Sequence, residues 1–253
     1  MKRFVAVTLG LLLASFIPVA SLAKGKAGRE AEMMRTMRAV LAQTKDPRQV
    51  AGLLSNHGAR FIGYQENKVT FVYTGDRVVP AQSVTKSVGP DFLPVVAVKN
   101  PAGAVRPDAG DKTDFTLTLW LYEWQNYDNT YTEQAVVNGY WSATEYPWLD
   151  QPADVIDVRW IVGDVVYLSS QPYDGVMRDQ HTNGIASYTV ADQVRNWDLY
   201  VNFKPVSSSV YGKWSNVFAN YTHTWWGRAQ KGSGVPRRSR NPRSFLCCLQ
   251  GSA

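Results

Sequence analysis

The chain has 253 residues, with 27 Lys or Arg, 21 Asp or Glu and two cysteines. Eight of these cations lie outside residues 24–227, which leaves 19 against 21 acids inside that range and a net charge of −2. We therefore expect no nucleic-acid partner for the folded body, because it lacks a general positive charge. Both cysteines, Cys247 and Cys248, lie beyond it. The body can thus form neither a disulfide nor a cysteine-ligated metal site.

Residues 1–23 have the pattern of a secretory signal peptide. Two cations precede an apolar run, and small residues end the segment at residues 21–23. Pro18 interrupts the apolar run, which is marginal for crossing a bilayer, so an uncleaved anchor is only the alternative. We expect a secreted, extracellular protein that begins at Lys24 and has no stable membrane span.

The next part, residues 24–99, reads as a helix-containing α+β segment. The stretch 29–43 carries apolar residues at helical spacing, which predicts a helix with one buried stripe. The stripe consists of Met33, Met34, Met37, Val40 and Leu41.

A second helix is predicted after Asp46, a suitable N-cap that is followed by Pro47. Gly58 suits a left-handed turn at its end, and His57 would lie near the negative end of the helix dipole as a cap. Two β-rich runs then flank Glu66-Asn67, which predicts a hairpin.

Residues 100–113 are rich in Pro and Gly without periodicity, which indicates a linker or long surface loop. From there to residue 227, seven strand-like runs follow one another without a helical pattern between them. We therefore predict a mainly β fold in which 114–227 form an antiparallel β-sandwich, or a barrel, after the small α+β part.

The run DFTLTLWLYEW at 114–124 is apolar on both faces, so both faces must be covered. Its aromatic face, together with aromatic residues of later segments, would suit stacking against sugar rings. Packing beneath the helix at 29–43 is the alternative. The candidate ligand-binding residues are Trp120, Tyr122, Trp124, Trp141, Tyr146 and Trp148.

No catalytic residue is assigned. His223 lies between Tyr221 and Trp225 on one strand face, without a nucleophile or an orienting carboxylate nearby in sequence. Paired carboxylates are the one open catalytic route, because glycoside hydrolysis requires two such groups in a cleft. The candidates are Glu123, Glu133, Glu145, Asp150 and Asp157.

The loop at 171–184 supplies oxygen ligands and His181, but its spacing does not match a calcium-binding EF-hand loop. We assign no metal and expect no cofactor. The long last run, 208–226, resembles in composition the strands that pore-forming toxins insert, but neither of its faces is uniformly apolar. An ordinary sheet strand is the preferred interpretation.

Residues 228–253 contain six cations, no acid and both cysteines, and they lack the strand alternation. We predict a disordered basic tail. Because charge, cysteine use and strand pattern all change at one point, an out-of-frame origin of this tail is a further hypothesis. The preferred function is non-catalytic binding of carbohydrate or cell-envelope polymer at the outer surface. A secreted polysaccharide hydrolase and a self-associating structural protein are the alternatives.

Overall fold

The structure is a computed structural model, and it describes residues 18–73, 78–99, 112–142, 154–191, 194–207, 217–223 and 243–249. The described chain is mostly antiparallel β, with two helices before the strands. The helices are α2 (Pro18–Gln43) and α3 (Pro47–Ser55). The strands are β1 (Ala59–Tyr73), β2 (Val78–Val88), β3 (Pro94–Lys99), β4 (Lys112–Gln125), β5 (Tyr131–Trp141), β6 (Asp154–Trp160), β7 (Val165–Tyr173), β8 (Val176–Thr182), β9 (Ile185–Val190), β10 (Asn196–Pro205), β11 (Val217–His223) and β12 (Arg243–Leu249).

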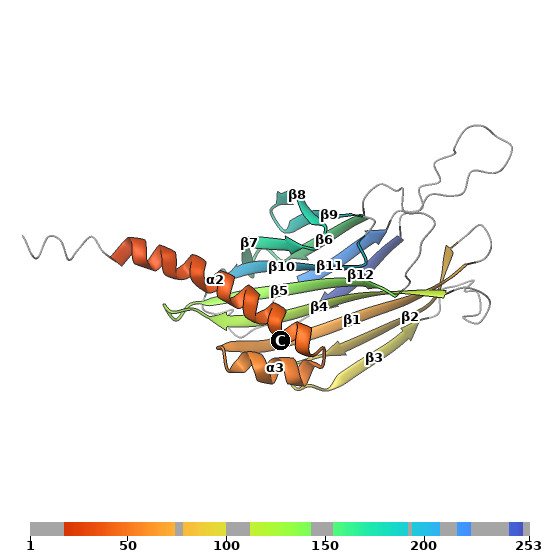
Figure 1. Ribbon diagram of the computed structural model, residues 1–253, viewed down its shortest axis with the longest axis horizontal. Coiled ribbons are helices and arrows are strands. Elements are labelled where there is room, and N and C mark those ends of the chain that lie inside the picture. The colour runs from red at the N-terminus through yellow and green to blue at the C-terminus, as the bar shows by residue number, and fades with distance from the viewer. Residues whose placement is uncertain are drawn as a thin grey trace, which may run out of the picture.

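The strands form two sheets in a sandwich-like arrangement (Figure 1). The larger sheet has the order β3-β2-β1-β4-β5-β10-β7, and the smaller has the order β12-β11-β6-β9-β8. One apolar core contains side chains from both sheets, among them Leu117 and Leu119 of β4 and Ile156 and Val158 of β6. The inner face of the larger sheet therefore packs against the smaller sheet.

The outer face of the larger sheet is covered by α2 along part of its length (Figure 1). The predicted stripe of this helix is confirmed: Met33, Met37, Val40 and Leu41 are buried, and Met34 packs against them half-buried. Neither described helix is long and apolar enough to cross a membrane.

The predicted start of α3 is also confirmed. The Asp46 carboxylate accepts hydrogen bonds from the backbone N–H groups of Arg48 and Gln49, and Pro47 is the first helical residue. Gly58 follows the helix with φ of +78°, a conformation that glycine adopts without steric cost. His57 lies beyond the last turn, and its backbone N–H donates to the Leu54 carbonyl.

The predicted hairpin at Glu66-Asn67 is wrong, because β1 runs through both residues without a turn. Strand β1 pairs with β2 on one side and β4 on the other, and both registers continue across these positions. The Asn67 side chain accepts a hydrogen bond from Ser83 of β2, and Glu66 accepts one from Tyr64. Both polar residues therefore belong to a long strand, Asn67 as a buried residue and Glu66 as a partly exposed one.

Each of the seven predicted runs after residue 113 contains a strand. An eighth strand, β8, occupies part of the stretch that we interpreted as an irregular loop, and it pairs with β9. The proposed division between 24–99 and 114–227 does not separate two sheets, since β1 and β4 are neighbours in the larger one. The linker that we placed at 100–113 lies outside the described residues up to residue 111, and its last two residues belong to β4.

Part of the predicted disordered tail is a strand. Arg243–Leu249 form β12, which pairs antiparallel with β11 from Val217↔Leu249 to His223↔Arg243. Residues 245–249 are apolar or cysteine, and the segment extends the smaller sheet by one strand at its edge. The structure therefore differs from our expectation for 243–249, while the other residues of the tail lie outside the described ones.

Candidate functional site

The aromatic row of β4 does not form an exposed platform. Trp120, Tyr122 and Trp124 are at most 1% exposed and belong to the apolar cluster beneath α2. The stripe of α2 covers their rings, which is the packing alternative that the sequence left open. A ring that is buried on both faces has no surface to offer a sugar, so these three residues do not form the predicted site.

The other aromatic residues of the predicted site do not extend the aromatic row of β4 in the described structure. Trp141 lies on the opposite side of the sheet, where its ring centre is 4.6 Å from that of Phe115 and 5.8 Å from that of Phe71. Tyr146 and Trp148 lie outside the described residues. The structure therefore brings together only the three buried rings of β4.

Strands β1 and β4 continue beyond the end of α2 (Figure 1). There the outer face of the sheet opens into a groove of about 500 Å³. This groove is the candidate site. Its lining comes from the end of α2 and from four adjacent strands. It consists of Leu41, Ala42, Lys45, Tyr64, Glu66, Thr116, Thr118, Trp120, Asn138, Gly139, Tyr140, Asn196, Trp197 and Asp198.

The polar floor of the groove is one row of residues that lie directly opposite each other across four strands. Glu66 of β1 pairs with Thr118 of β4, Thr118 pairs with Asn138 of β5, and Asn138 pairs with Asp198 of β10. Since residues opposite one another in a sheet point to the same face, all four side chains lie on the outer surface. The row therefore carries a carboxylate at each end and neutral polar groups between them.

Hydrogen bonds fix the middle of this row. The Thr118 hydroxyl donates to Asn138 Oδ1 at 2.9 Å, and Asn138 Nδ2 donates to Asp198 Oδ1 at 2.6 Å. These two contacts determine which way the amide of Asn138 faces. They also hold the Asp198 carboxylate against the floor of the groove, so that its position does not depend on a ligand.

Aromatic side chains form the second part of the groove. Tyr140 of β5 lies next to the row and is 48% exposed. Tyr64 donates a hydrogen bond of 2.6 Å to Glu66, and its ring centre is 4.2 Å from that of the buried Trp120. The buried row of β4 therefore supports the groove from below, while Tyr140 offers the accessible ring.

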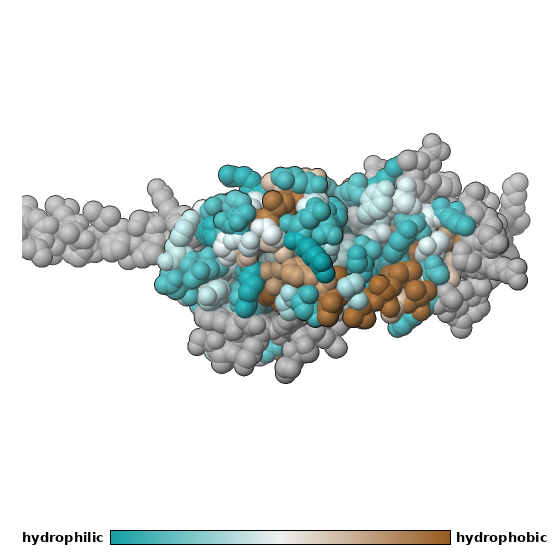
Figure 2. All heavy atoms as spheres, turned by 90° about the horizontal axis from the view of Figure 1, so that it is seen from below, coloured by the Kyte–Doolittle hydropathy of each residue, from teal (hydrophilic) through white to brown (hydrophobic). Residues whose placement is uncertain are grey.

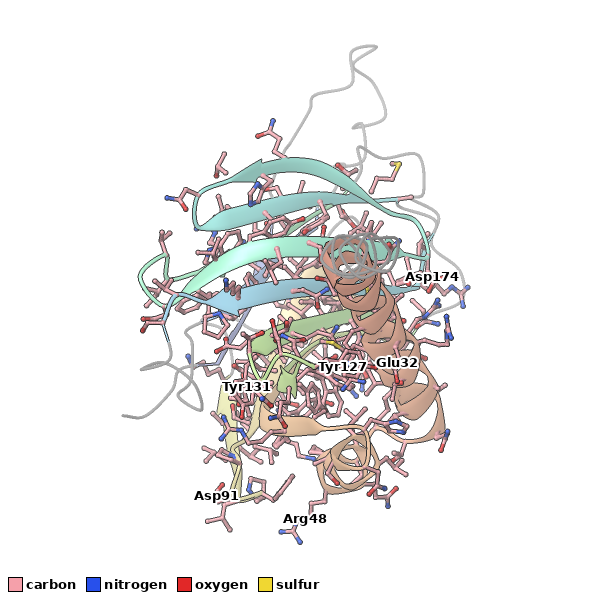
Figure 3. The ribbon with its side chains drawn as sticks, turned by 90° about the vertical axis from the view of Figure 1, so that its left-hand side faces the viewer. Glu32, Arg48, Asp91, Tyr127, Tyr131 and Asp174 are labelled. Atoms are coloured by element: carbon pink, nitrogen blue, oxygen red, sulfur yellow. The ribbon has the colours of Figure 1, made fainter. Side chains whose placement is uncertain are left out.

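A second groove, of about 650 Å³, lies between α2 and β7 and is lined by Arg35, Arg38 and Tyr173 among others. The Arg38 guanidinium carbon is 4.0 Å from the centre of the Tyr173 ring, and Nη2 is 3.8 Å from the Asp174 carboxylate. Figure 3 shows Asp174 beside α2. Arg38 is therefore already engaged by residues of the protein.

The structure brings two of the candidate catalytic carboxylates together, but not in an open cleft. Glu123 and Glu133 are directly opposite each other in the register of β4 and β5, and both are buried. Arg60 forms an ion pair with Glu123. Asp157 lies on another strand, where it accepts a hydrogen bond from Ser187 and contacts Arg159. Glu145 and Asp150 lie outside the described residues.

The histidines do not assemble a catalytic group in the described part of the chain. The ring of His181 packs against Tyr167 and Trp160, with centres 4.1 and 6.0 Å apart. His57 is exposed, and its carbonyl accepts a hydrogen bond from Arg29. The side chain of His223 lies outside the described atoms. Within the described ranges, no group of three or more His, Cys, Asp or Glu residues is placed to hold a metal ion.

Sequence reasoning missed the groove carboxylates Glu66 and Asp198. A weak signal exists, because Thr116 and Thr118 alternate with buried leucines on β4 and mark a stretch whose outer face is polar. Only the register of four strands shows that these positions lie side by side. No protein-family model matches the chain, and no curated protein matches it either.

Proposed function

We propose that this protein is a secreted, non-catalytic binding protein that holds a carbohydrate in the groove at the end of α2. The observation that carries the proposal is the row from Glu66 to Asp198 beside the exposed ring of Tyr140. Sugar hydroxyls donate to carboxylates, and the apolar face of a sugar ring packs on an aromatic side chain. The volume of the groove is also typical of ligand sites, which measure about 300–1,000 Å³.

The spacing of the acids favours binding over hydrolysis. Glu66 and Asp198 are three strand positions apart in the sheet order β1-β4-β5-β10. At about 4.8 Å for each spacing, their backbones are about 14 Å apart. Glycoside hydrolysis uses carboxyl groups about 5–9.5 Å apart, so this pair is too widely separated to act on one glycosidic bond.

Isothermal titration calorimetry of the purified protein with a panel of polysaccharides and their oligosaccharides tests the proposal. Asp198→Asn and Tyr140→Ala are each expected to weaken binding by about tenfold, since hydrogen bonds to charged groups contribute about 1.5–3 kcal/mol and aromatic contacts about 0.5–1.5 kcal/mol. Tyr127→Ala is the matched control, because Tyr127 is 74% exposed and does not line the groove.

Two results would count against this function. The first is that no carbohydrate in the panel binds. The second is that a bound carbohydrate is unaffected by both groove substitutions, although circular dichroism shows that the variants are folded. Release of reducing ends from a bound polysaccharide would instead favour the hydrolase alternative.

Export is the second part of the proposal, and it rests on the pattern of residues 1–23. Cleavage after Ala23 would leave a helix that begins at Lys24 and keeps the whole buried stripe, which starts at Met33. Mass spectrometry of the protein recovered outside the cell is expected to give a mature chain that begins at Lys24. Retention of the full chain in the cytoplasm would exclude this route.

A further inference from the structure

Strand β3 is the outermost strand of the larger sheet, and among the residues that the structure describes none covers either of its faces. All six of its residues are exposed. Its three valines, Val95, Val96 and Val98, are 67%, 59% and 57% exposed, and Leu93 just before it is 63% exposed. Figure 2 shows this apolar patch in the view from below, where β3 lies. In the part of the chain that the structure describes, β3 pairs with β2 only.

Such an edge strand is unusual because natural edges are normally protected against pairing with other chains. Protection comes from lysine or proline within the strand, from bulges, or from a covering element. In β3, Pro94 and Lys99 are the terminal residues, and the stretch 95–98 between them is entirely Val and Ala. Its register with β2 has no bulge. The middle of β3 is therefore a regular, apolar pairing surface.

We propose that β3 is a dimerisation strand that pairs antiparallel with β3 of a second copy of this chain. A twofold arrangement of this kind uses the same surface on both copies, so the assembly is complete with two copies. The two larger sheets then become one continuous sheet across the dimer. With Val96 of each copy opposite Val96 of the other on one face, Val95 lies opposite Ala97 on the other face. Apolar pairs of this kind stabilise neighbouring strands.

The charges at the ends of the strand favour a second copy in the antiparallel direction. Lys99 ends β3, and the exposed Asp91 precedes its start by three residues. Figure 3 shows Asp91 at the lower rim of the molecule. Antiparallel pairing brings Lys99 of each copy to the end of the other strand where Asp91 lies. Parallel pairing would place Lys99 beside Lys99, and opposite charges across a pair are favourable whereas like charges are not.

Sedimentation velocity of the purified protein over a wide concentration range tests this proposal, which does not depend on the groove. The protein is expected to form a dimer with no larger assembly. Val96→Lys is expected to raise the dimer Kd by about tenfold or more. The twofold symmetry places one new lysine from each copy in the interface, where the two positive charges repel each other. Val166→Lys is the control, since Val166 is 52% exposed on β7, the strand at the opposite end of the sheet.

A charge exchange tests the direction of pairing and does not rely on one variant. Asp91→Lys alone is expected to weaken the dimer, because it places like charges together. Adding Lys99→Asp in the same chain is expected to restore it. A protein that is monomeric at every concentration, a dimer unaffected by Val96→Lys, or a dimer lost with Val166→Lys would each overturn the proposal. Failure of the double exchange to restore the dimer would overturn the antiparallel pairing.

Discussion

Asn138 Nδ2 donates a hydrogen bond of 2.6 Å to the carboxylate of Asp198, one strand away on the outer face of the larger sheet. Asn138→Asp would place a second carboxylate at this distance from Asp198. Two such carboxylates cannot both ionise without cost, so the pKa of one of them would be raised. A raised folded-state pKa of an acid means that stability is lost as the pH increases through and above its ordinary value near 4.

We therefore expect Asn138→Asp to lower the free energy of unfolding by about 1–3 kcal/mol at pH 7 and by much less at pH 4. Urea unfolding at both pH values measures the difference. Asn196→Asp is the control, because Asn196 is exposed at the start of the same strand as Asp198. Equal losses for Asn138→Asp at both pH values would contradict the electrostatic explanation.

Gly139 is expected to be intolerant of a side chain. A Cβ atom built there would lie 2.2–2.5 Å from three atoms of the Trp197 indole, which is its direct neighbour on β10. Because Trp197 is almost fully buried, it has little room to move. Gly139→Ala should therefore destabilise the protein by about 1–3 kcal/mol through overpacking. Chemical denaturation measures this loss.

Gly52→Ala provides the matched control for that substitution. Gly52 lies within α3, and a Cβ there has no atom within 4 Å. Alanine is favoured over glycine in a helix by about 1 kcal/mol, so this variant should be slightly more stable than the natural protein. If both glycine variants lost the same stability, crowding against Trp197 would not be the cause.

Because two tyrosines are buried, we expect the protein to lose stability at alkaline pH. Burial raises the pKa of Tyr122 and of Tyr200 well above the ordinary value near 10, and the nearby Asp198 raises the pKa of Tyr200 further. A raised folded-state pKa means that the stabilisation is complete below pH 10. It is lost as the pH rises above 10, because only the unfolded state then releases the proton.

We expect Tyr122→Phe to reduce this alkaline loss. Within the described part of the chain, the Tyr122 hydroxyl has no hydrogen-bond partner, and neither has that of Tyr200. Removing an unsatisfied buried hydroxyl should also raise stability at pH 7 by about 1 kcal/mol. Thermal unfolding between pH 7 and pH 11 measures both effects. The exposed Tyr127→Phe serves as the control, and a Tyr122→Phe variant as alkali-sensitive as the natural protein would refute the assignment.

The sequence predicts best those features that depend on neighbours within one or two turns. The buried stripe from Met33 to Leu41 follows from helical spacing, and the start of α3 follows from Asp46 and Pro47 in succession. Seven of the described strands from β4 onward follow from alternation, whereas β8 and β12 do not. These helices and the seven strands could be predicted because each sequence pattern spans only a few consecutive residues.

The site required information that no local pattern contains. Glu66, Thr118, Asn138 and Asp198 are widely separated in sequence and meet only because four strands pair in a particular register. The same limit explains the error at Glu66-Asn67, where two polar residues on a long paired strand have the composition of a turn. Likewise, the pattern of β4 required a cover over Trp120 and Trp124, but it did not say whether a helix or a ligand supplied it.

Arg29 connects α2 to the sheet, and we expect it to control how firmly the helix is held. Its Nη2 atom donates to the carbonyl oxygens of His57 and Gln125, at 3.0 and 3.4 Å. Its guanidinium carbon is 5.9 Å from the centre of the Trp124 ring and 5.3 Å from that of Tyr127. Lysine keeps the charge but lacks the planar fork that makes these contacts together.

Arg29→Lys should therefore lower the free energy of unfolding by about 1–3 kcal/mol, and it should increase hydrogen exchange in α2 more than in the strands. Exchange measured by mass spectrometry separates the helix from the sheet. Arg35→Lys is the control at an exposed position of the same helix. Unchanged exchange in α2 of the Arg29 variant would mean that the apolar stripe alone holds the helix, because Met33 and Met37 would then suffice to fix it over Trp120 and Tyr122.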